Sequence, residues 1–281
     1  MTNDDLEDIQ PQNTFAHSGT RMARDPEVWR YMDLLSLLAL LQNRELHFTR
    51  LRDLQRLDPN EGTGGLSINL VRYPFTPSIV TVPGDERTAA RERKEIAAIE
   101  AELRVPFETS LPAWREQVAV WDAEFKNMHV SCWHTSPSQS DFMWRLYAKH
   151  EFGFAVESSA KTVVEALSVP PIASSKIGWG FVVYPTRDQL IQERLSGSPL
   201  LQAPYIIKHP EFAHENEFRV FVKARDDADC SLPVDLKTLV KAIHISPLMP
   251  AWAHGAVAKT LKPICDAIGS PPIRVSRPLL R

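Results

Sequence analysis

The sequence predicts an α+β fold with a mixed or antiparallel sheet at its core, flanking helices and a helical insertion. Short segments rich in branched and aromatic residues alternate with short amphipathic segments over most of the chain. No repeat period is visible. The chain has 281 residues, of which 43% are hydrophobic, so it can bury a sizeable core and is not mostly disordered.

The charge balance excludes a protein held on duplex DNA mainly by its overall charge, although a local basic groove stays open. Lys and Arg number 32 against 35 Asp and Glu, which gives a net charge of -3. The N-terminus is acidic and polar, unlike a signal peptide, and the leucine-rich residues 34–41 are too few to cross a membrane. We therefore expect a soluble, cytoplasmic protein with no membrane partner, and its oligomeric state stays open.

The cysteines favour a reducing compartment. Cys132, Cys230 and Cys265 are too few and too scattered for a disulfide framework, and their number is odd. We expect three free thiols.

The chain is expected to hold one domain after a short arm. Residues 1–25 are polar and predict a flexible N-terminal arm, and residues 26–281 predict a single α+β domain. Residues 62–125 differ in character and predict an insertion. Within it, residues 86–104 place three apolar side chains at helical spacing on a charged background, which predicts a helix that can act as a lid.

The first elements of the domain follow directly from the pattern. Residues 28–32 predict a strand, and residues 33–42 predict a helix with Asp33 as its N-cap. This helix is apolar nearly all round, so we expect it to be buried. Residues 45–49 predict a second strand with its apolar side chains on one face.

Strands and helices alternate closely in the second half of the chain. Strands are expected at residues 129–135, 152–157, 178–184, 218–223, 242–245 and 272–276. Helices are expected at residues 140–149, 161–167, 188–195 and 251–268, the last of which Gly269 closes.

Two glutamates form the first candidate site. Because side chains alternate in a strand, Glu215, Glu217 and Arg219 are expected to share one face. One carboxylate can activate a nucleophile while the other stabilises positive charge that develops on a sugar carbon. The alternative is an exposed strand edge on which Glu217 only pairs with Arg219.

A second candidate is the polar segment at residues 132–144, between a predicted strand and a predicted helix. Alternation puts Cys132, His134 and Ser136 on one side of the strand and Thr135 on the other. The N-terminus of the following helix can bind a nucleotide phosphate. The alternative is that these hydroxyl groups only cap the helix and form the turn.

Metal binding is not expected. His129 lies on the other side of the strand from Cys132 and His134, and no second cluster completes a tetrahedral site. The P-loop, the dinucleotide-binding glycine motif, the H-E-x-x-H motif and the G-x-S-x-G motif are all missing from the sequence.

Basic and aromatic residues form a third candidate. Arg30 can hold a phosphate or carboxylate with two hydrogen bonds, and the alternative is an ion pair with a nearby acid. Tyr31 follows it in the sequence. Trp144 and Tyr147, three apart on a predicted helix, can stack on a base, and the alternative places them in the core. Tyr31, Trp144 and Tyr147 are therefore candidate nucleotide-binding residues.

Taken together, four segments resemble the bacterial domain-of-unknown-function family 2971. They are residues 29–42, 46–61, 132–153 and 208–219, so the resemblance covers about residues 28–250. Such proteins occur in mobile and defence-associated contexts, and the family itself implies no settled activity.

The order of these motifs is also similar, more distantly, to the R-S-E class of ADP-ribosyltransferases. The similarity implies that Arg30 would hold the pyrophosphate of NAD and that Thr135 and Ser136 would order the site. Glu217 would bind the nicotinamide ribose and stabilise its oxocarbenium ion, and Glu215 would steer the acceptor. This is a likeness of fold and motif order.

We therefore expect an NAD-dependent ADP-ribosyltransferase-like enzyme, in bacterial defence or with toxin activity, that uses NAD as substrate and a protein or nucleic acid as acceptor. One alternative is a non-catalytic nucleotide or nucleic-acid binding or sensor module. It would use the Trp144/Tyr147 helix and residues 208–219. The other is a metal-dependent nuclease, in which Asp58 and Glu61 would join the two later glutamates around Mg²⁺.

Overall fold

The computed structural model describes a large part of the chain, and the account below concerns these residues: 2–8, 22–54, 127–148, 152–167, 173, 176–186, 189, 204–225 and 230–276. The chain divides into two compact units. The first comprises Met1–Arg50, Met128–Val182 and His214–Arg281, and the second comprises Leu51–Asn127 and Val183–Ala213.

This division differs from the single domain that the sequence predicted. Residues 183–213 group with the segment that was expected to be a simple insertion at 62–125. Residues 62–125, with the expected lid helix at 86–104, lie outside the described residues, and so do most of the helix expected at 188–195 and the acidic residues Asp58 and Glu61.

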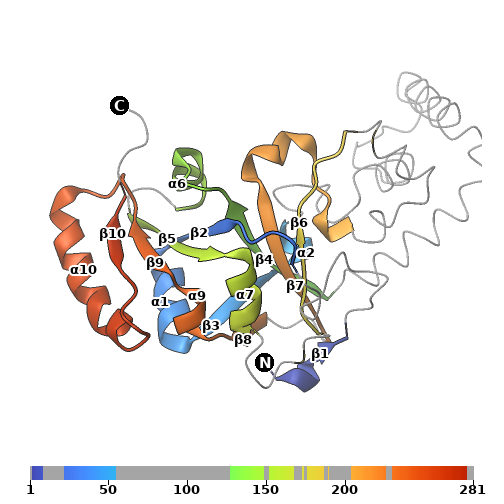
Figure 1. Cartoon of the computed structure of the whole chain (residues 1–281), viewed down its shortest axis with the longest axis horizontal. Coiled ribbons are helices and arrows are strands. Elements are labelled where there is room, and N and C mark those ends of the chain that lie inside the picture. The colour runs from blue at the N-terminus through green and yellow to red at the C-terminus, as the bar shows by residue number, and fades with distance from the viewer. Residues whose placement is uncertain are drawn as a thin grey trace, which may run out of the picture. The chain divides into compact units, whose positions relative to one another are not determined.

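The first unit is an α+β fold built on an open, mostly antiparallel sheet, as the sequence predicted (Figure 1). Its strand order is β1-β7-β4-β2-β5-β9-β10, with β3 paired to β4 and β8, and β6 paired to β7. The pair β9 and β10 is parallel. The strands are β1 (Leu6–Glu7), β2 (Glu27–Asp33), β3 (Glu45–Arg50), β4 (Met128–Thr135), β5 (Gly153–Ser159), β6 (Gly178–Phe181), β7 (Glu217–Ala224), β8 (Cys230–Pro233), β9 (Ala242–Ile245) and β10 (Ile273–Val275).

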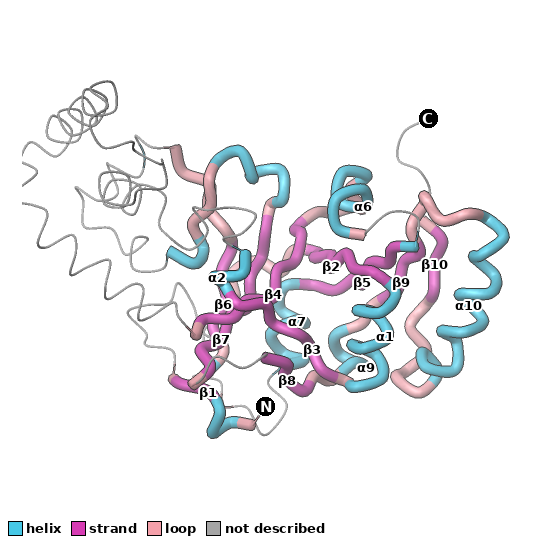
Figure 2. The backbone as a smooth tube through the Cα atoms, turned by 180° about the vertical axis from the view of Figure 1, so that it is seen from behind, coloured by secondary structure: helices cyan, strands magenta, loops and turns pink. Residues whose placement is uncertain are grey.

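Helices cover the two faces of this sheet unequally. The helices of the first unit are α1 (Leu34–Asn43), α6 (Asp141–Tyr147), α7 (Ala160–Leu167), α9 (Leu236–Leu239) and α10 (Ala251–Asp266). The main core joins α1, α7, α9 and α10 to one face, whereas a small cluster joins α6 to the other face through Trp29 and Tyr31. Figures 1 and 2 show α6 on the opposite side of the sheet from α1, α7 and α9. We call the face under α6 the α6 face and the other the core face.

Local sequence explains how α1 begins and which side it buries. The side chain of Asp33 accepts a hydrogen bond from the backbone N–H of Ser36 at 2.8 Å, so the predicted N-cap is confirmed. The expectation that α1 is buried on all sides was wrong. Leu37, Leu40 and Leu41 pack in the core, but Leu35 is 77% exposed. An apolar residue on a helix is buried only where another element covers it.

Residues 2–8 do not belong to a flexible arm, which was expected at residues 1–25. Leu6 is fully buried and pairs with Ala224 at the edge of β7. The Nζ of Lys176 donates to the backbone oxygen of Leu6 at 2.7 Å, and Lys223 pairs with Glu7 at 2.9 Å. A hydrogen-bonded strand and a buried leucine tie residues 2–8 to the sheet, while residues 9–21 lie outside the described part of the chain.

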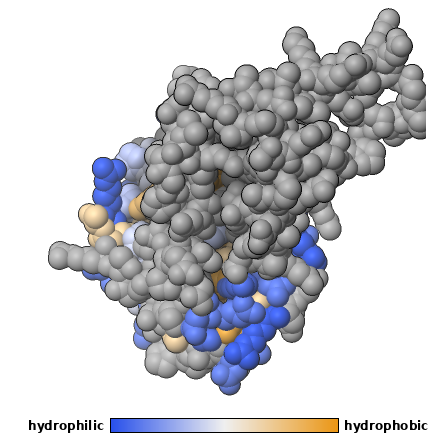
Figure 3. All heavy atoms as spheres, turned by 90° about the vertical axis from the view of Figure 1, so that its right-hand side faces the viewer, coloured by the Kyte–Doolittle hydropathy of each residue, from blue (hydrophilic) through white to orange (hydrophobic). Residues whose placement is uncertain are grey.

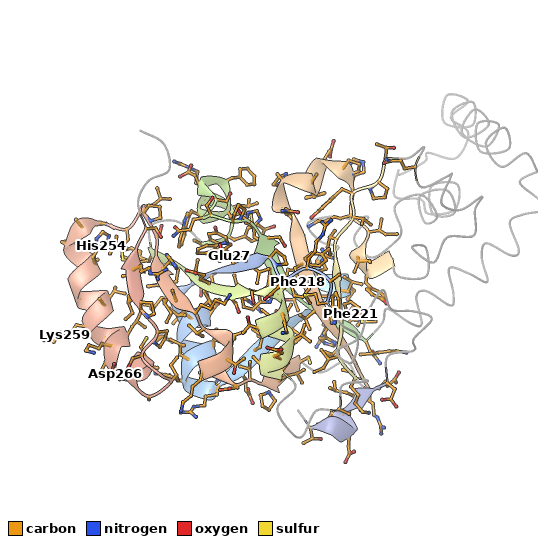
Figure 4. The ribbon with its side chains drawn as sticks, in the orientation of Figure 1. Glu27, Phe218, Phe221, His254, Lys259 and Asp266 are labelled. Atoms are coloured by element: carbon orange, nitrogen blue, oxygen red, sulfur yellow. The ribbon has the colours of Figure 1, made fainter. Side chains whose placement is uncertain are left out.

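Close packing fixes the position of β6 against β7. A Cβ atom added at Gly178 would lie 2.0 Å from the ring of Phe221, so only a glycine fits opposite this phenylalanine. Phe221 and Phe218, both on β7 and labelled in Figure 4, are fully buried. They are three residues apart, so they belong to opposite faces of the sheet.

The remaining elements agree closely with the sequence. Within the described residues, the expected strands and helices appear within a few residues of their predicted ends, and Gly269 has a left-handed φ of 101° after α10. The short elements β1, β8 and α9 were not predicted. The second unit contributes α2 (Leu51–Leu54) and a 3-10 helix at Pro204–Ile206 among its described residues.

The described residues that are visible in Figure 3 are mainly hydrophilic. Across the described ranges we find no helix with the length and apolar character that a membrane crossing requires. The three cysteines all fall within those ranges and form no disulfide. Burial raises the pKa of the Cys230 thiol to about 12, so it stays protonated.

Candidate functional site

Register places the polar residues of β7 and β4 side by side. The two strands are antiparallel, with Glu217 opposite His134 and Arg219 opposite Cys132. His134 in turn lies opposite Trp29 of β2. Residues directly opposite one another in an antiparallel sheet share a face, so these side chains lie on the α6 face.

Glu217 and Arg219 form a buried ion pair. Arg219 Nε donates to Glu217 Oε2 at 2.6 Å, and the side chains are 0% and 6% exposed. The pairing that the sequence analysis weighed is therefore present, but the exposed strand edge that it assumed is wrong. β7 has β4 on one side and β1 and β6 on the other, so this strand is not open to solvent. The pair fixes the carboxylate in one orientation.

Glu215 reaches the same cluster from outside the strand. It ends a 3-10 helix at Pro210–Glu215, and the left-handed Asn216, with φ 41°, separates it from β7. The prediction that Glu215 continues the alternation of the strand is therefore wrong. Its carboxylate nevertheless accepts a hydrogen bond from the hydroxyl of Tyr147 at 2.6 Å and is buried. A helix of the α6 face is thus tied to the start of β7.

His134 was not among the site residues that the sequence predicted. Its Nδ1 lies 2.6 Å from the backbone oxygen of Glu215. A carbonyl only accepts, so Nδ1 carries the hydrogen of the neutral ring and Nε2 keeps its lone pair. Burial lowers the pKa of His134, which keeps the ring neutral near pH 7. No hydrogen bond to Nε2 is found among the described residues. From the sequence, this histidine was considered only as a zinc ligand, because the sequence does not show which residues of neighbouring strands lie opposite one another.

Aromatic rings border this cluster. The ring centroid of Tyr31 lies 6.2 Å from that of His134 and 4.9 Å from that of Trp144. Burial raises the pKa of Tyr31 to about 12, and it raises the pKa of Tyr147 as well, with the hydrogen bond to Glu215 adding to the effect. Both phenols therefore stay protonated at neutral pH. The hydroxyl of Tyr31 accepts from the backbone N–H of Ser140 at 2.9 Å, and the hydroxyl of Tyr147 donates to Glu215.

Trp144 and Tyr147, the two aromatic residues of α6 that were expected to stack on a base, have different roles. Trp144 is 1% exposed and donates its indole N–H to Gln139 at 3.2 Å, which agrees with the alternative that placed it in the core. It is not available for stacking on a base. Tyr147 is 38% exposed, so its ring can also meet a ligand.

Thr135 and Ser136 connect strands rather than line the cluster. Thr135 donates its backbone N–H to Asn216 and accepts from the side chain of Asn216 at 2.5 Å. The backbone of Ser136 bonds to Glu27 and to the indole of Trp29. The cap of α6 is Ser140, whose hydroxyl accepts from Met143. These contacts fit the alternative of capping and turn formation.

Arg30 is not part of this cluster. It follows Trp29 in β2 and lies opposite Val156 of β5, so its side chain belongs to the core face. There it bonds to Ser131 and to the backbone oxygen of His47. The expected convergence of Arg30 with Glu215 and Glu217 does not occur. Among the described residues no carboxylate pairs with Arg30, so the alternative of an ion pair stays a prediction for the rest of the chain.

A separate polar group lies further along the α6 face. His244 of β9 bonds to Glu157 of β5 at 2.7 Å, and Arg274 of β10 bonds to the same carboxylate oxygen at 3.1 Å. The other ring nitrogen of His244 lies 2.8 Å from the amide nitrogen of Gln139. Both nitrogens of this histidine are therefore occupied, unlike those of His134, and the group joins strands rather than offering a reactive atom.

No group of three or more His, Cys, Asp or Glu side chains that could hold a metal ion occurs among the residues described. The convergence of Asp58 and Glu61 with the later glutamates stays a prediction. No protein-family model, curated protein or solved structure matches this chain.

Proposed function

We propose that this chain breaks the N-glycosidic bond of NAD and passes ADP-ribose to water or to a macromolecular acceptor. The observation that carries the proposal is the meeting of Glu215, Glu217, His134 and Tyr147 on one face of the sheet. Arg30, which the sequence placed at the pyrophosphate, has no part in it.

The carboxylate of Glu217 suits the charge that such a reaction develops. The bond between the ribose carbon and the nicotinamide nitrogen breaks, and its electron pair leaves with nicotinamide. Positive charge then builds on the ribose carbon. A carboxylate that Arg219 already holds in place stabilises this charge without reorganisation in the transition state.

His134 suits the second half of the reaction. The acceptor forms its bond to the ribose carbon and must lose a proton. Nε2 of His134 can accept that proton, because the hydrogen bond from Nδ1 to the carbonyl of Glu215 fixes the tautomer. Glu215 is then a positioning residue for His134 and Tyr147, and the ring of Tyr147, which is 38% exposed, offers aromatic surface to the nicotinamide ring.

The experiment measures nicotinamide release from NAD by the full chain, with cell extract as a source of acceptor. Glu217→Gln keeps the shape of the side chain and removes its charge, and it should slow release about a hundredfold. Glu217→Asp should retain more activity than Glu217→Gln. Glu7→Gln is the matched control, since it removes a carboxylate that pairs with Lys223 of the same strand.

Melting curves separate chemistry from folding, because each variant is assayed below its own transition. No release by the wild type, or full release by Glu217→Gln, would contradict the proposal. Binding of NAD without release would favour the alternative of a non-catalytic nucleotide-binding module.

A further inference from the structure

One peptide group links the start of β7 to the imidazole of His134. Glu215 and Asn216 share this peptide group, and its carbonyl oxygen lies 2.6 Å from Nδ1 of His134. In a regular strand the carbonyl oxygens lie near the plane of the sheet and bond to the neighbouring strands, whereas side chains stand on its faces. A carbonyl that bonds to a side chain on the α6 face is therefore turned out of the ladder.

The backbone of Asn216 accounts for this turn. Its φ of 41° lies in the left-handed region, which residues other than glycine, asparagine and aspartate seldom adopt. An extended φ at this position would continue β7 through Glu215 and return the carbonyl of Glu215 to the ladder.

Two hydrogen bonds to Thr135 hold Asn216 in this conformation. The backbone oxygen of Asn216 accepts from the N–H of Thr135 at 2.8 Å, and the side-chain amide of Asn216 donates to the backbone oxygen of Thr135 at 2.5 Å. Thr135 follows His134 in β4, which lies beside β7 (Figure 1). The residue after the histidine is thus tied to the residue after the carbonyl that the histidine binds.

We propose that Asn216 is a positioning residue that determines which nitrogen of the His134 ring carries the hydrogen. Because it holds the carbonyl of Glu215 against Nδ1, the hydrogen stays on Nδ1 and Nε2 keeps a lone pair that can accept a proton. The use of this lone pair in proton transfer rests on the proposed function, whereas the tautomer itself does not.

Two substitutions separate the backbone of Asn216 from its side chain. Asn216→Gly keeps the left-handed backbone, because glycine adopts a positive φ without steric cost, but loses the amide. Asn216→Ala loses the amide and also favours a negative φ. The effect on His134 should therefore be larger in Asn216→Ala than in Asn216→Gly.

The test records the ring nitrogen signals of the histidines in the isotope-labelled full chain by NMR near neutral pH, with His134→Gln to assign the ring. The wild type should carry the hydrogen on Nδ1. In Asn216→Ala it should distribute over both nitrogens, and Asn216→Gly should lie between the two. Ser270→Ala is the matched control, because Ser270 also has a left-handed φ, of 57°, and a side chain that donates to Asp266 at 3.2 Å. Its His134 signals should equal those of the wild type.

Two results would overturn the proposal. One is a wild type with the hydrogen on Nε2 of His134. The other is an Asn216→Ala variant, folded by its melting curve, that keeps the hydrogen fully on Nδ1. If Asn216→Ala does not fold, Asn216→Gly carries the test, and an unchanged tautomer there overturns the proposal.

The spectra need no NAD, so they test Asn216 even in a chain that releases no nicotinamide, a result that would contradict only the proposed function. In an active chain, Asn216→Ala should slow nicotinamide release about tenfold, because only part of the His134 rings then offer Nε2 as a base. Ser270→Ala should release nicotinamide at the rate of the wild type.

Discussion

Arg30 and Glu217 lie on opposite faces of the same sheet. Arg30 lies opposite Val156, whereas its neighbour Trp29 connects through His134 to Glu217. A strand turns successive side chains to opposite sides, so one step along β2 separates the two residues completely.

This separation predicts that Arg30 has no effect on the cleavage of NAD. Arg30→Met should release nicotinamide at the rate of the wild type when both are folded, because no atom of Arg30 borders the Glu217 cluster. The measurement is the initial rate at saturating NAD. A large loss of rate in a variant that melts normally would show that the α6 face is not the reactive site.

Substitution of Glu217 should lower stability more than an exposed pair would. Glu217→Gln removes a charged hydrogen bond from the fully buried Arg219, so the free energy of unfolding should fall by about 1–3 kcal/mol. Glu7→Gln breaks a half-exposed pair with Lys223, so it should lower that free energy by less than about 1 kcal/mol. Urea unfolding of both variants measures these free energies. Equal losses of free energy in the two variants would contradict the expectation that burial makes the Glu217 pair contribute more.

Tyr147 should anchor α6 through Glu215. Tyr147→Phe keeps the ring and removes the hydroxyl that donates to the buried carboxylate at 2.6 Å. We expect a loss of about 1–3 kcal/mol in the free energy of unfolding, and faster amide exchange in α6. Phe142→Leu, which changes a half-exposed ring on the same helix, serves as the control and should leave exchange in α6 nearly unchanged.

Acidification should destabilise the first unit through two histidines. Burial lowers the pKa of His134 and of His244, although hydrogen bonds to the Glu215 carbonyl and to Glu157 oppose the shift. The unfolded chain then takes up protons first as the pH falls. The stabilising contribution is complete above about pH 6.5 and is lost as the pH falls toward the lower folded pKa.

To test this, the melting temperature is measured from pH 7.5 to pH 5 in steps of about half a pH unit, which cover the usual histidine range. His244→Gln should flatten the lower part of the curve, because glutamine does not titrate there. A wild-type curve that rises on acidification would show the opposite sign of the pKa shifts.

Gly178 should accept no side chain. Gly178→Ala places a Cβ atom 2.0 Å from the ring of Phe221, so either the ring or the strand must move. We expect a loss of about 1–3 kcal/mol in unfolding free energy. Gly178→Ala combined with Phe221→Leu should recover part of it. Gly255→Ala, at a position with open space, provides the control and should not destabilise the chain.

Periodicity predicted the longer elements of the first unit well, because each of these strands and helices has a distinct apolar pattern. The strand with Leu46 and Phe48 on one face is confirmed, since both are buried. β8 was missed because it is a short strand that pairs only with β3, and its four residues carry too little pattern.

The candidate site was predicted less well. Glu217 and Tyr147 could be chosen by residue type, but their partners depend on contacts between distant parts of the chain. The bond from Tyr147 to Glu215 spans 68 residues, and the bond from His134 spans 81. The left-handed Asn216, which takes Glu215 out of the strand, also has no clear sign in the sequence.

The N-terminal strand has a consequence for the time at which the fold can be completed. Lys176, which donates to the carbonyl of Leu6, leaves the ribosome 170 residues after Leu6, and β7 follows later still. Leu6 therefore stays without these partners while the intervening residues are synthesised. Contacts between residues so far apart in the sequence form slowly, because closing the long loop between them costs conformational entropy before the contact stabilises the fold. β1 can accordingly join the sheet only after β7, which ends at Ala224, has been synthesised.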